Sequence, residues 1–455
     1  MALEKVRGTS LEYYLISFDE KGHERPENGK LTSQQVLDVL TSQPITDVFL
    51  MSHGWQGDIP AAKDQYQRWI AAMADNQADI QKMQQLQPGF SPLLIGLHWP
   101  SKPWGNENLN AQIPSFDTAD SQLNDLIDDY ARQVSDTEAS REALRTIFSA
   151  AIEYDTPPEN LPPEVAAAYQ VLLVEASSYN QSEDTSEWND TEPLNFDPET
   201  VYQASLEENT EEISFGIGDS IASAWDKFLN VPRLLSFWKM KDLARKIGQT
   251  SGFNLLTKLQ QVADDRVRFH LMGHSFGTIF VSATVAGTKD NNRLVRPVNS
   301  LALIQGAVSL WSYTGKVPYR QNLAGYFHPI ISDRKVSGPI ITTQSRYDNA
   351  VRVAYPVAGT MGLGIGQDIH FDVSKPSYPG VGGIGFYGIQ GEDLDITDID
   401  MLNPNKSYDF KPGKIYNLES SNYITVPNPD PFVGAHNAID NPAVAHAVWS
   451  AALVN

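Results

Sequence analysis

Short apolar runs, separated by longer amphipathic stretches, recur along most of this chain. The clearest run is VFLM at residues 48–51, which ends two positions before a His-Gly pair. An uninterrupted run of this kind is typical of a strand buried on both faces of a parallel sheet. Six further segments predict strands: 11–22, 91–101, 266–272, 298–309, 337–351 and 413–426.

Segments with helical patterning lie between these runs. The helices that we expect cover residues 59–83, 136–154, 162–179, 219–231, 236–248, 253–265, 278–287 and 441–454. Short apolar strands that alternate with helices, and that are joined by long crossovers, indicate a parallel sheet wrapped by helices. The predicted fold class is therefore α/β, with a mostly parallel central sheet.

Two segments in the last third of the chain have an unusual composition. Residues 359–391 contain ten glycines but lack the Gly-Lys-Ser/Thr ending of a P-loop, and Gln367 stands where a dinucleotide fingerprint requires its third glycine. We expect a folded glycine-rich loop there. The segment EDLDITDIDML, at 392–402, lacks the loop glycine and final glutamate spacing of an EF-hand. We expect an exposed strand with one acidic face.

The charge of the chain is concentrated in one segment. The net charge is −22 over 455 residues, and residues 117–212 alone hold 24 acidic and three basic residues, a net charge of −21. We interpret this segment as an acidic, largely helical insertion that acts as a cap or lid on a near-neutral core formed by residues 1–116 and 213–455. The alternative is a solvated, partly disordered loop with no role. Such a chain is not expected to bind nucleic acid or anionic lipid surfaces over a broad face.

The composition narrows the chemistry further. The chain has no cysteine, which excludes disulfides, zinc–thiolate sites and thiol nucleophiles. It contains no run of about 18 apolar residues, so no integral membrane segment is expected. The opening MALEKVRGTS lacks an apolar stretch after its charges. We therefore expect a cytoplasmic protein, or one exported without a classical signal peptide.

The string GHSFG at residues 273–277 introduces the candidate chemistry. Gly-x-Ser-x-Gly alone arises by chance in roughly one chain in ten of this length, so its surroundings decide its meaning. A strand is predicted directly before it and a helix of small apolar residues directly after it. This is the setting of a nucleophile elbow, in which Ser275 occupies a strained turn and exposes its hydroxyl above the sheet edge.

The neighbours of Ser275 fit this role. Gly273 and Gly277 are expected because a Cβ at either position would collide with the neighbouring strand or helix. The N–H of Phe276 would point at the space where an oxyanion forms, aided by the helix N-terminus.

A serine hydroxyl needs a base to take its proton, and in this architecture the acid and then the histidine follow the serine along the chain. Three histidines follow Ser275: His370, His436 and His446. His446 lies within the last predicted helix, where we expect a packed or a surface position, and His370 lies in or beside the glycine-rich loop. His436 sits between the last predicted strand and the last helix, and is the predicted base.

The acid should end a strand between the serine and the histidine. Asp348 follows the IITT strand, whereas Asp333 precedes that strand and Asp372 lies in a loop. Asp348 would accept a hydrogen bond from His436 Nδ1–H and fix its tautomer. Its alternative role is to cap a helix that begins at NAVRVAY.

The second oxyanion donor should come from a loop after an early strand. FLMSHGWQGD places the amides of Gly54 and Trp55 as candidates. His53 precedes the serine in the chain, so we expect it to order the loop rather than to act as the base. Trp55 would form a wall of the pocket or pack in the core.

GHSFG, with Asp348 and His436 following in order and HGW upstream, resembles the α/β-hydrolase superfamily, and within it the serine esterases and lipases. MSHGW, IGLHWPS, LSFWKMKDLARKIG, LIQGAVS and GAHNAI are also similar to segments of a group of poorly characterised bacterial hydrolases. The resemblance covers about 1–116 and 213–455. It implies a mostly parallel sheet flanked by helices, often with an inserted lid, although 117–212 interrupts the core before the common lid position.

These residues predict a serine hydrolase that cleaves carboxylic esters through an acyl-enzyme, with a small-molecule or lipid ester as substrate and no metal or organic cofactor. The same triad also serves amidases and peptidases. Two alternatives stay open. One is a lipase or phospholipase delivered into another cell as an effector, and the other is a catalytically silent binding or scaffolding protein on the same fold.

Overall fold

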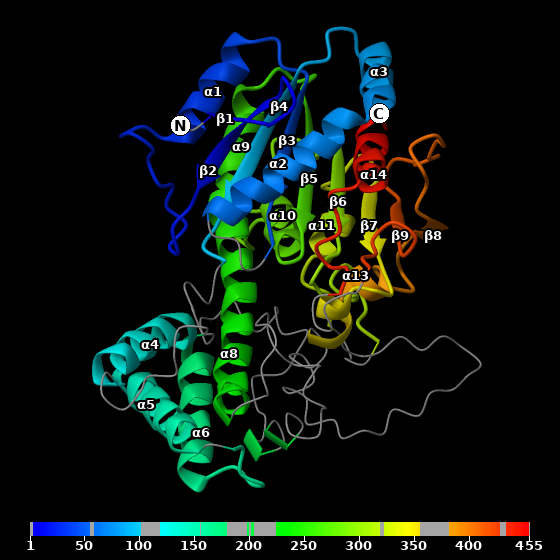
Figure 1. Ribbon diagram of the computed structural model, residues 1–455. Helices are drawn as coiled ribbons and strands as arrows, with labels where there is room; N and C mark the ends of the chain where they lie inside the picture. Colours follow the sequence, from blue (N-terminus) through cyan, green and yellow to red (C-terminus); the bar gives the residue numbers. More distant parts are fainter. Residues whose placement is uncertain are drawn as a thin grey trace, which may run out of the picture.

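The computed structural model describes residues 3–54, 59–101, 119–154, 156–179, 198–199, 202–203, 224–318, 323–354, 382–427 and 434–454 (Figure 1). Within these residues the chain forms a nine-stranded sheet with helices on both faces, which is an α/β fold.

The strand order across the sheet is β1-β2-β4-β3-β5-β6-β7-β9-β8. β1 runs antiparallel to β2, and the other neighbouring pairs are parallel. All eight strands expected from the sequence are present, and β1 is an additional one. The strands are β1 (Leu3–Lys5), β2 (Glu12–Ser17), β3 (Asp47–Ser52), β4 (Pro92–His98), β5 (Arg268–His274), β6 (Ser300–Ile304), β7 (Ile340–Gln344), β8 (Ile396–Asp400) and β9 (Ile415–Glu419).

Apolar side chains of the central strands alternate between two cores, one on each face of the sheet. In β3, Val48 and Leu50 pack in one core and Phe49 and Met51 in the other. The first core is completed by α1 (Thr32–Ser42), α8 (Ala224–Ile247), α9 (Phe253–Val262) and α10 (Gly277–Ala286). The second is completed by α2 (Ile59–Asp75), α3 (Gln77–Leu86) and α14 (Pro442–Ala452). This two-sided burial explains why the strand is apolar at every position from 48 to 51.

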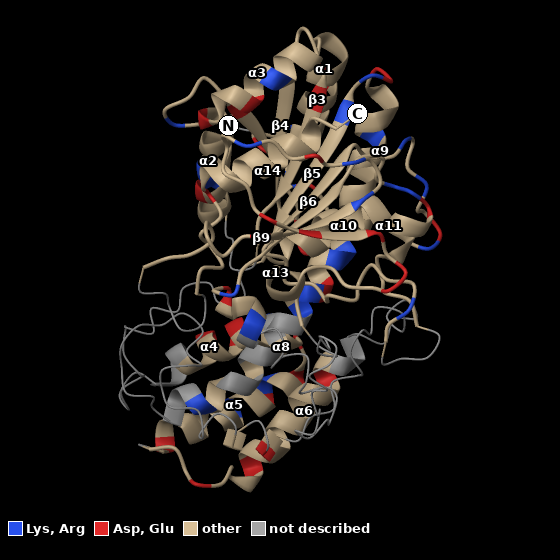
Figure 2. Cartoon of the chain, turned by 90° about the vertical axis from the view of Figure 1, so that its right-hand side faces the viewer, with Lys and Arg blue, Asp and Glu red and all other residues tan. Residues whose placement is uncertain are grey.

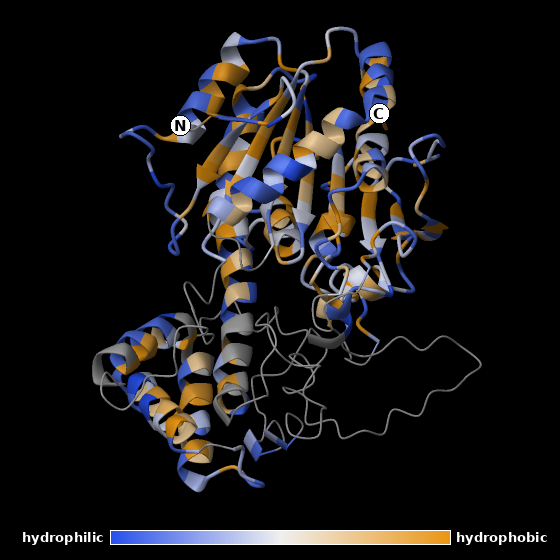
Figure 3. Ribbon diagram, viewed as in Figure 1, coloured by the Kyte–Doolittle hydropathy of each residue, from blue (hydrophilic) through white to orange (hydrophobic). Residues whose placement is uncertain are grey.

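Three helices, α4 (Ala119–Val134), α5 (Glu138–Glu153) and α6 (Pro163–Tyr179), form a separate layer that we call the helical unit. Their hydrophobic positions gather where the helices meet (Figure 3), and buried residues such as Tyr130, Phe148 and Tyr169 fill the interface. Acidic side chains are spread over the same helices (Figure 2). The helical unit lies beyond the carboxyl ends of the parallel strands, and α8 runs from it to the sheet (Figure 1). The boundaries of the acidic insertion, placed at residues 117 and 212 from the sequence, stay a prediction.

Several elements differ from the sequence-based expectation. The helix expected at 59–83 is divided at Asn76, whose side-chain amide donates to the carbonyl of Pro442 at 2.9 Å. The helices expected at 219–231 and 236–248 form one helix, α8, that contains Pro232. α1 was not expected from the sequence, because only a narrow stripe of this polar segment is buried. The buried residues are Thr32, Val36 and Leu40.

The two unusual segments have different outcomes. Residues 359–381 of the glycine-rich segment lie outside the described residues. The exposed strand expected within 392–402 is β8, which lies at one edge of the sheet and has half-buried or exposed side chains. The remaining short elements are η1 (Gly248–Gly252), α11 (His328–Ser332), η2 (Ala350–Ala354) and α13 (Ile384–Tyr387).

Candidate active site

Ser275 occupies a tight turn between β5 and α10. Its φ is +55°, in the left-handed region that a residue with a Cβ rarely adopts. The turn is held by the main chain: Ser275 N–H donates to the Ile304 carbonyl at 3.2 Å, and the Ser275 carbonyl accepts from Thr278 N–H at 3.1 Å and Ala307 N–H at 3.3 Å. The strained turn expected at this serine is confirmed.

The two glycines of GHSFG are required by close backbone contacts. A Cβ on Gly273 would lie 2.3 Å from the carbonyl oxygen of Gly277. A Cβ on Gly277 would lie 2.3 Å from the carbonyl oxygen of Ser52 and 2.4 Å from that of His53. These atoms are backbone and cannot rotate away, so both positions exclude any larger residue.

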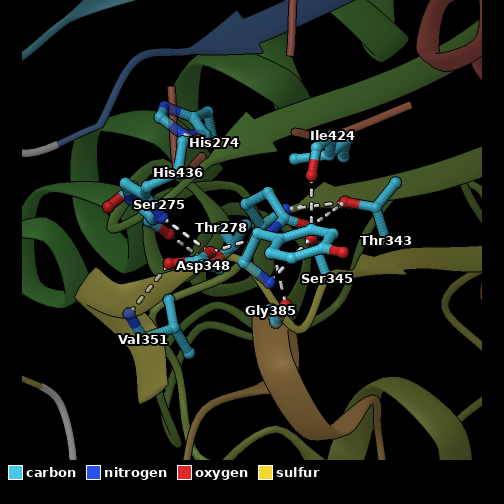
Figure 4. Close-up of polar contacts among 12 residues, drawn as sticks. His274, Ser275, Thr278, Thr343, Ser345, Asp348, Val351, Gly385, Ile424 and His436 are labelled. Atoms are coloured by element: carbon cyan, nitrogen blue, oxygen red, sulfur yellow. Dashed lines mark hydrogen bonds and ion pairs between the residues drawn. The ribbon is translucent and has the colours of Figure 1, made fainter. Parts of the chain in front are cut away.

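Asp348 and His436 meet at the same edge of the sheet (Figure 4). Asp348 follows β7 and His436 precedes α14, and His436 Nδ1 lies 2.8 Å from Asp348 Oδ2 with both side chains buried. The structure therefore brings together the predicted base and the predicted acid. Within the described part of the chain, no hydrogen bond joins the Ser275 hydroxyl to His436. In a free enzyme such catalytic bonds are often long and tighten only when substrate binds.

Asp348 also caps the turn that follows it, which was the alternative role expected from the sequence. Its Oδ1 accepts from Val351 N–H at 2.9 Å, and its carbonyl accepts from Arg352 N–H at 3.0 Å at the start of η2. One carboxylate oxygen thus fixes the following turn while the other faces His436.

Gly434 allows the loop that carries His436 to pack closely against the loop that carries Asp348. Gly434 has a φ of +55°, and a Cβ there would lie 2.1 Å from the carbonyl oxygen of Tyr347. The N–H of Ala435 donates to the same carbonyl at 2.7 Å. These contacts set the distance between the imidazole and the carboxylate.

His274, the residue before the serine, links the elbow to His436. The Gln65 side-chain amide donates to His274 Nδ1 at 2.9 Å, so Nε2 carries the hydrogen and donates to the His436 carbonyl at 2.9 Å. The two imidazole rings lie 4.7 Å apart between centroids. Burial lowers the pKa of His274 well below its usual value, which keeps it neutral in this role. The sequence placed His274 in the motif but did not indicate this contact.

The loop after β3 reaches the candidate nucleophile. A Cβ on Gly54 would lie 2.7 Å from Ser275 Cβ, so this backbone passes directly beside the serine. The Gly54 carbonyl accepts from His53 Nδ1–H at 2.8 Å and from the Ser101 hydroxyl at 3.0 Å. His53 therefore orders the loop, as expected. Trp55 lies outside the described residues.

The other predicted donor, Phe276, directly follows the serine in the chain. Phe276 is buried and stands at the N-terminal end of α10, with helical backbone angles. This places its amide at the positive end of the α10 dipole, next to Ser275.

The remaining candidate acids and bases lie elsewhere. His446 is buried in α14 and bonds Asp79 of α3 through Nδ1 at 2.7 Å, so it is a packed residue, as expected. Asp333 follows α11 on the surface and pairs with Lys335 at 4.0 Å. His370 and Asp372 lie outside the described residues.

One residue at the site was missed from the sequence. Gln305 follows β6 and donates from Nε2 to Asp348 Oδ2 at 2.8 Å. The available signal was its position in LIQGAVS, a polar residue before a glycine at the end of an apolar strand.

No family model, curated protein or solved structure matches this chain. In the residues that the structure describes, no group of three or more His, Asp or Glu side chains could hold a metal ion. Among the described helices, none combines the length and apolar character needed to cross a bilayer.

Proposed function

We propose that this protein is a serine hydrolase that cleaves carboxylic esters through an acyl-enzyme. The observation that carries the proposal is the 2.8 Å contact between His436 Nδ1 and the buried Asp348 carboxylate, at the sheet edge where Ser275 occupies a left-handed turn. The order Ser, Asp, His along the chain and the strand–turn–helix setting agree with a nucleophile elbow.

The proposed reaction uses side chains and amides of the protein together with water. Ser275 Oγ attacks the ester carbonyl while His436 Nε2 takes its proton, and Asp348 holds Nδ1–H and stabilises the imidazolium. The amides of Phe276 and of Gly54 or Trp55 stabilise the oxyanion. His436 then protonates the alcohol that leaves, and water activated by the same imidazole releases the acyl group.

We assign the chain, as part of this proposal, to the α/β-hydrolase fold with the acidic segment as a cap. Two features support the assignment: the mostly parallel sheet with Ser275 at the carboxyl end of β5, and the helical unit beyond that edge. A silent binding protein has no evident need for a strained serine, since a left-handed residue with a Cβ costs roughly 1–2 kcal/mol.

Hydrolysis of p-nitrophenyl esters from acetate to palmitate tests this proposal. Wild type should turn over, and Ser275→Ala should fall to background. Ser282→Ala is the matched control, because Ser282 is a buried serine of α10 that bonds the Thr278 carbonyl at 2.6 Å and the Tyr313 hydroxyl at 2.6 Å.

The chain-length optimum separates the two ester-cleaving alternatives. An optimum at short acyl chains indicates an esterase, and one at long chains indicates a lipase. If wild type hydrolyses no ester and Ser275 does not react with a fluorophosphonate, the proposal is wrong and the binding-protein alternative is favoured.

A further inference from the structure

A second residue with left-handed backbone stands beside the elbow, at the end of the neighbouring strand. Gln305 follows β6, is fully buried and has a φ of +44°. β6 pairs with β5, so Gln305 and Ser275 occupy equivalent positions at the carboxyl edge of adjacent strands. Strain of this kind persists only where the surrounding structure over-determines it.

The orientation of the Gln305 amide is fixed by Thr343 of β7. The Gln305 main-chain N–H donates to Thr343 Oγ1 at 2.9 Å, and Thr343 Oγ1 in turn donates to Gln305 Oε1 at 2.9 Å. Because the oxygen of the amide is committed to this hydroxyl, Nε2 must face the other way. It donates to Asp348 Oδ2 at 2.8 Å and to the Gly385 carbonyl at 3.2 Å (Figure 4 shows the surroundings).

Asp348 is therefore surrounded by donors. Gln305 Nε2 and His436 Nδ1 meet Oδ2, and Val351 N–H meets Oδ1, in a site that excludes solvent from the carboxylate. Because Gln305 Nε2 and His436 Nδ1 both contact Asp348 Oδ2, the Gln305 amide fixes the direction in which this oxygen faces the imidazole.

We infer that Gln305 is a positioning residue of the active site, which aims Asp348 Oδ2 at His436, and that Thr343 orients Gln305 for this task. The inference rests on the proposed function, because it assigns Gln305 to the machinery that activates Ser275. Gln305 touches neither substrate nor the reacting atoms, so its effect is expected in the rate of the chemical step rather than in substrate binding.

Four variants test the inference. Gln305→Met keeps the length of the side chain and removes the donor, and kcat should fall about 10- to 100-fold, the range expected for a hydrogen bond to a charged group, with KM changed less than about threefold. Thr343→Val should lower kcat in the same way, and Thr343→Ser should recover at least half of that loss on a logarithmic scale.

Gln305→Glu supplies a readout that a purely structural role would not move. The introduced carboxyl group can donate to Asp348 while it is neutral, and it repels Asp348 once it ionises. The ratio of its kcat to that of wild type should therefore fall about tenfold or more between pH 6 and pH 9. This ratio remains measurable even where Gln305→Met folds poorly.

Gln260→Met is the matched control. Gln260 is equally buried on α9 and donates to the Arg296 carbonyl at 2.9 Å, away from Asp348. It should lose stability without the loss of kcat expected for Gln305→Met.

Labelling of Ser275 by a fluorophosphonate separates failure of this inference from failure of the proposed function. If wild type labels and hydrolyses esters while Gln305→Met matches it in kcat and Gln305→Glu shows a constant ratio, the inference is wrong and the function stands. If wild type neither labels nor hydrolyses, both are wrong.

Discussion

Replacing Asp348 with asparagine exchanges one acceptor oxygen of the buried carboxylate for an NH2 group. Three donors face this side chain: His436 Nδ1 and Gln305 Nε2 at Oδ2, each at 2.8 Å, and Val351 N–H at Oδ1, at 2.9 Å. The new amide can adopt two orientations. An NH2 group that replaces Oδ2 meets Gln305 and forces His436 into the tautomer with its hydrogen on Nε2. An NH2 group that replaces Oδ1 meets Val351 N–H.

Each orientation leaves one buried donor facing another donor, which costs about 1–3 kcal/mol. We therefore expect the free energy of unfolding of Asp348→Asn to fall by about that amount. Both orientations also remove the negative charge that stabilises the imidazolium, and one removes the basic nitrogen as well. We expect kcat to fall by about 10³- to 10⁴-fold, as for the loss of the carboxylate in known Ser-His-Asp enzymes.

The assay is steady-state hydrolysis of the best p-nitrophenyl ester, with urea unfolding of the same preparations. Asp333→Asn is the control, because Asp333 is the exposed aspartate that precedes the same strand, and it should leave both kcat and stability unchanged. A folded Asp348→Asn protein with kcat within tenfold of wild type would refute the assignment of Asp348 as the acid.

Three further predictions follow from the same contacts. Gly434→Ala should lower kcat more than about tenfold, as measured by ester kinetics. A left-handed residue with a Cβ costs roughly 1–2 kcal/mol, and this Cβ would lie only 2.1 Å from the Tyr347 carbonyl oxygen and so displace the His436 loop. Gly277→Ala should destabilise the fold by about 1–3 kcal/mol, as overpacking does, which urea unfolding detects, and unchanged stability contradicts it. Burial lowers the pKa of His270 and His274, so the unfolded chain binds protons below about pH 6.5 that the folded chain does not. The unfolding free energy should fall between pH 7.5 and 5.5, by up to about 1.4 kcal/mol per pH unit for each histidine, and a flat profile over this range rules out the contribution.

Much of the fold was predictable because its strands are buried on both faces. The run at 48–51 is apolar at each position because its side chains alternate between two cores. This apolar pattern is therefore present whatever the details of side-chain packing. The helices were less predictable. α1 buries a narrow stripe of a polar segment. α2 ends at Asp75, and the next residue, Asn76, donates to the carbonyl of Pro442, far away in the chain.

The sequence by itself determined the alternation of strands and helices through its hydrophobic pattern. It also indicated the local strain at Ser275 through the Gly-x-Ser-x-Gly motif, and the candidates for acid and base through their order along the chain. The tertiary structure decided which candidates meet. His436 reaches Asp348 because Gly434 packs against the loop after β7, and Gln305 reaches the same carboxylate because β6 and β7 are neighbours. Contacts between distant segments depend on sheet order and on backbone clearance, and a single sequence does not encode either in its local pattern.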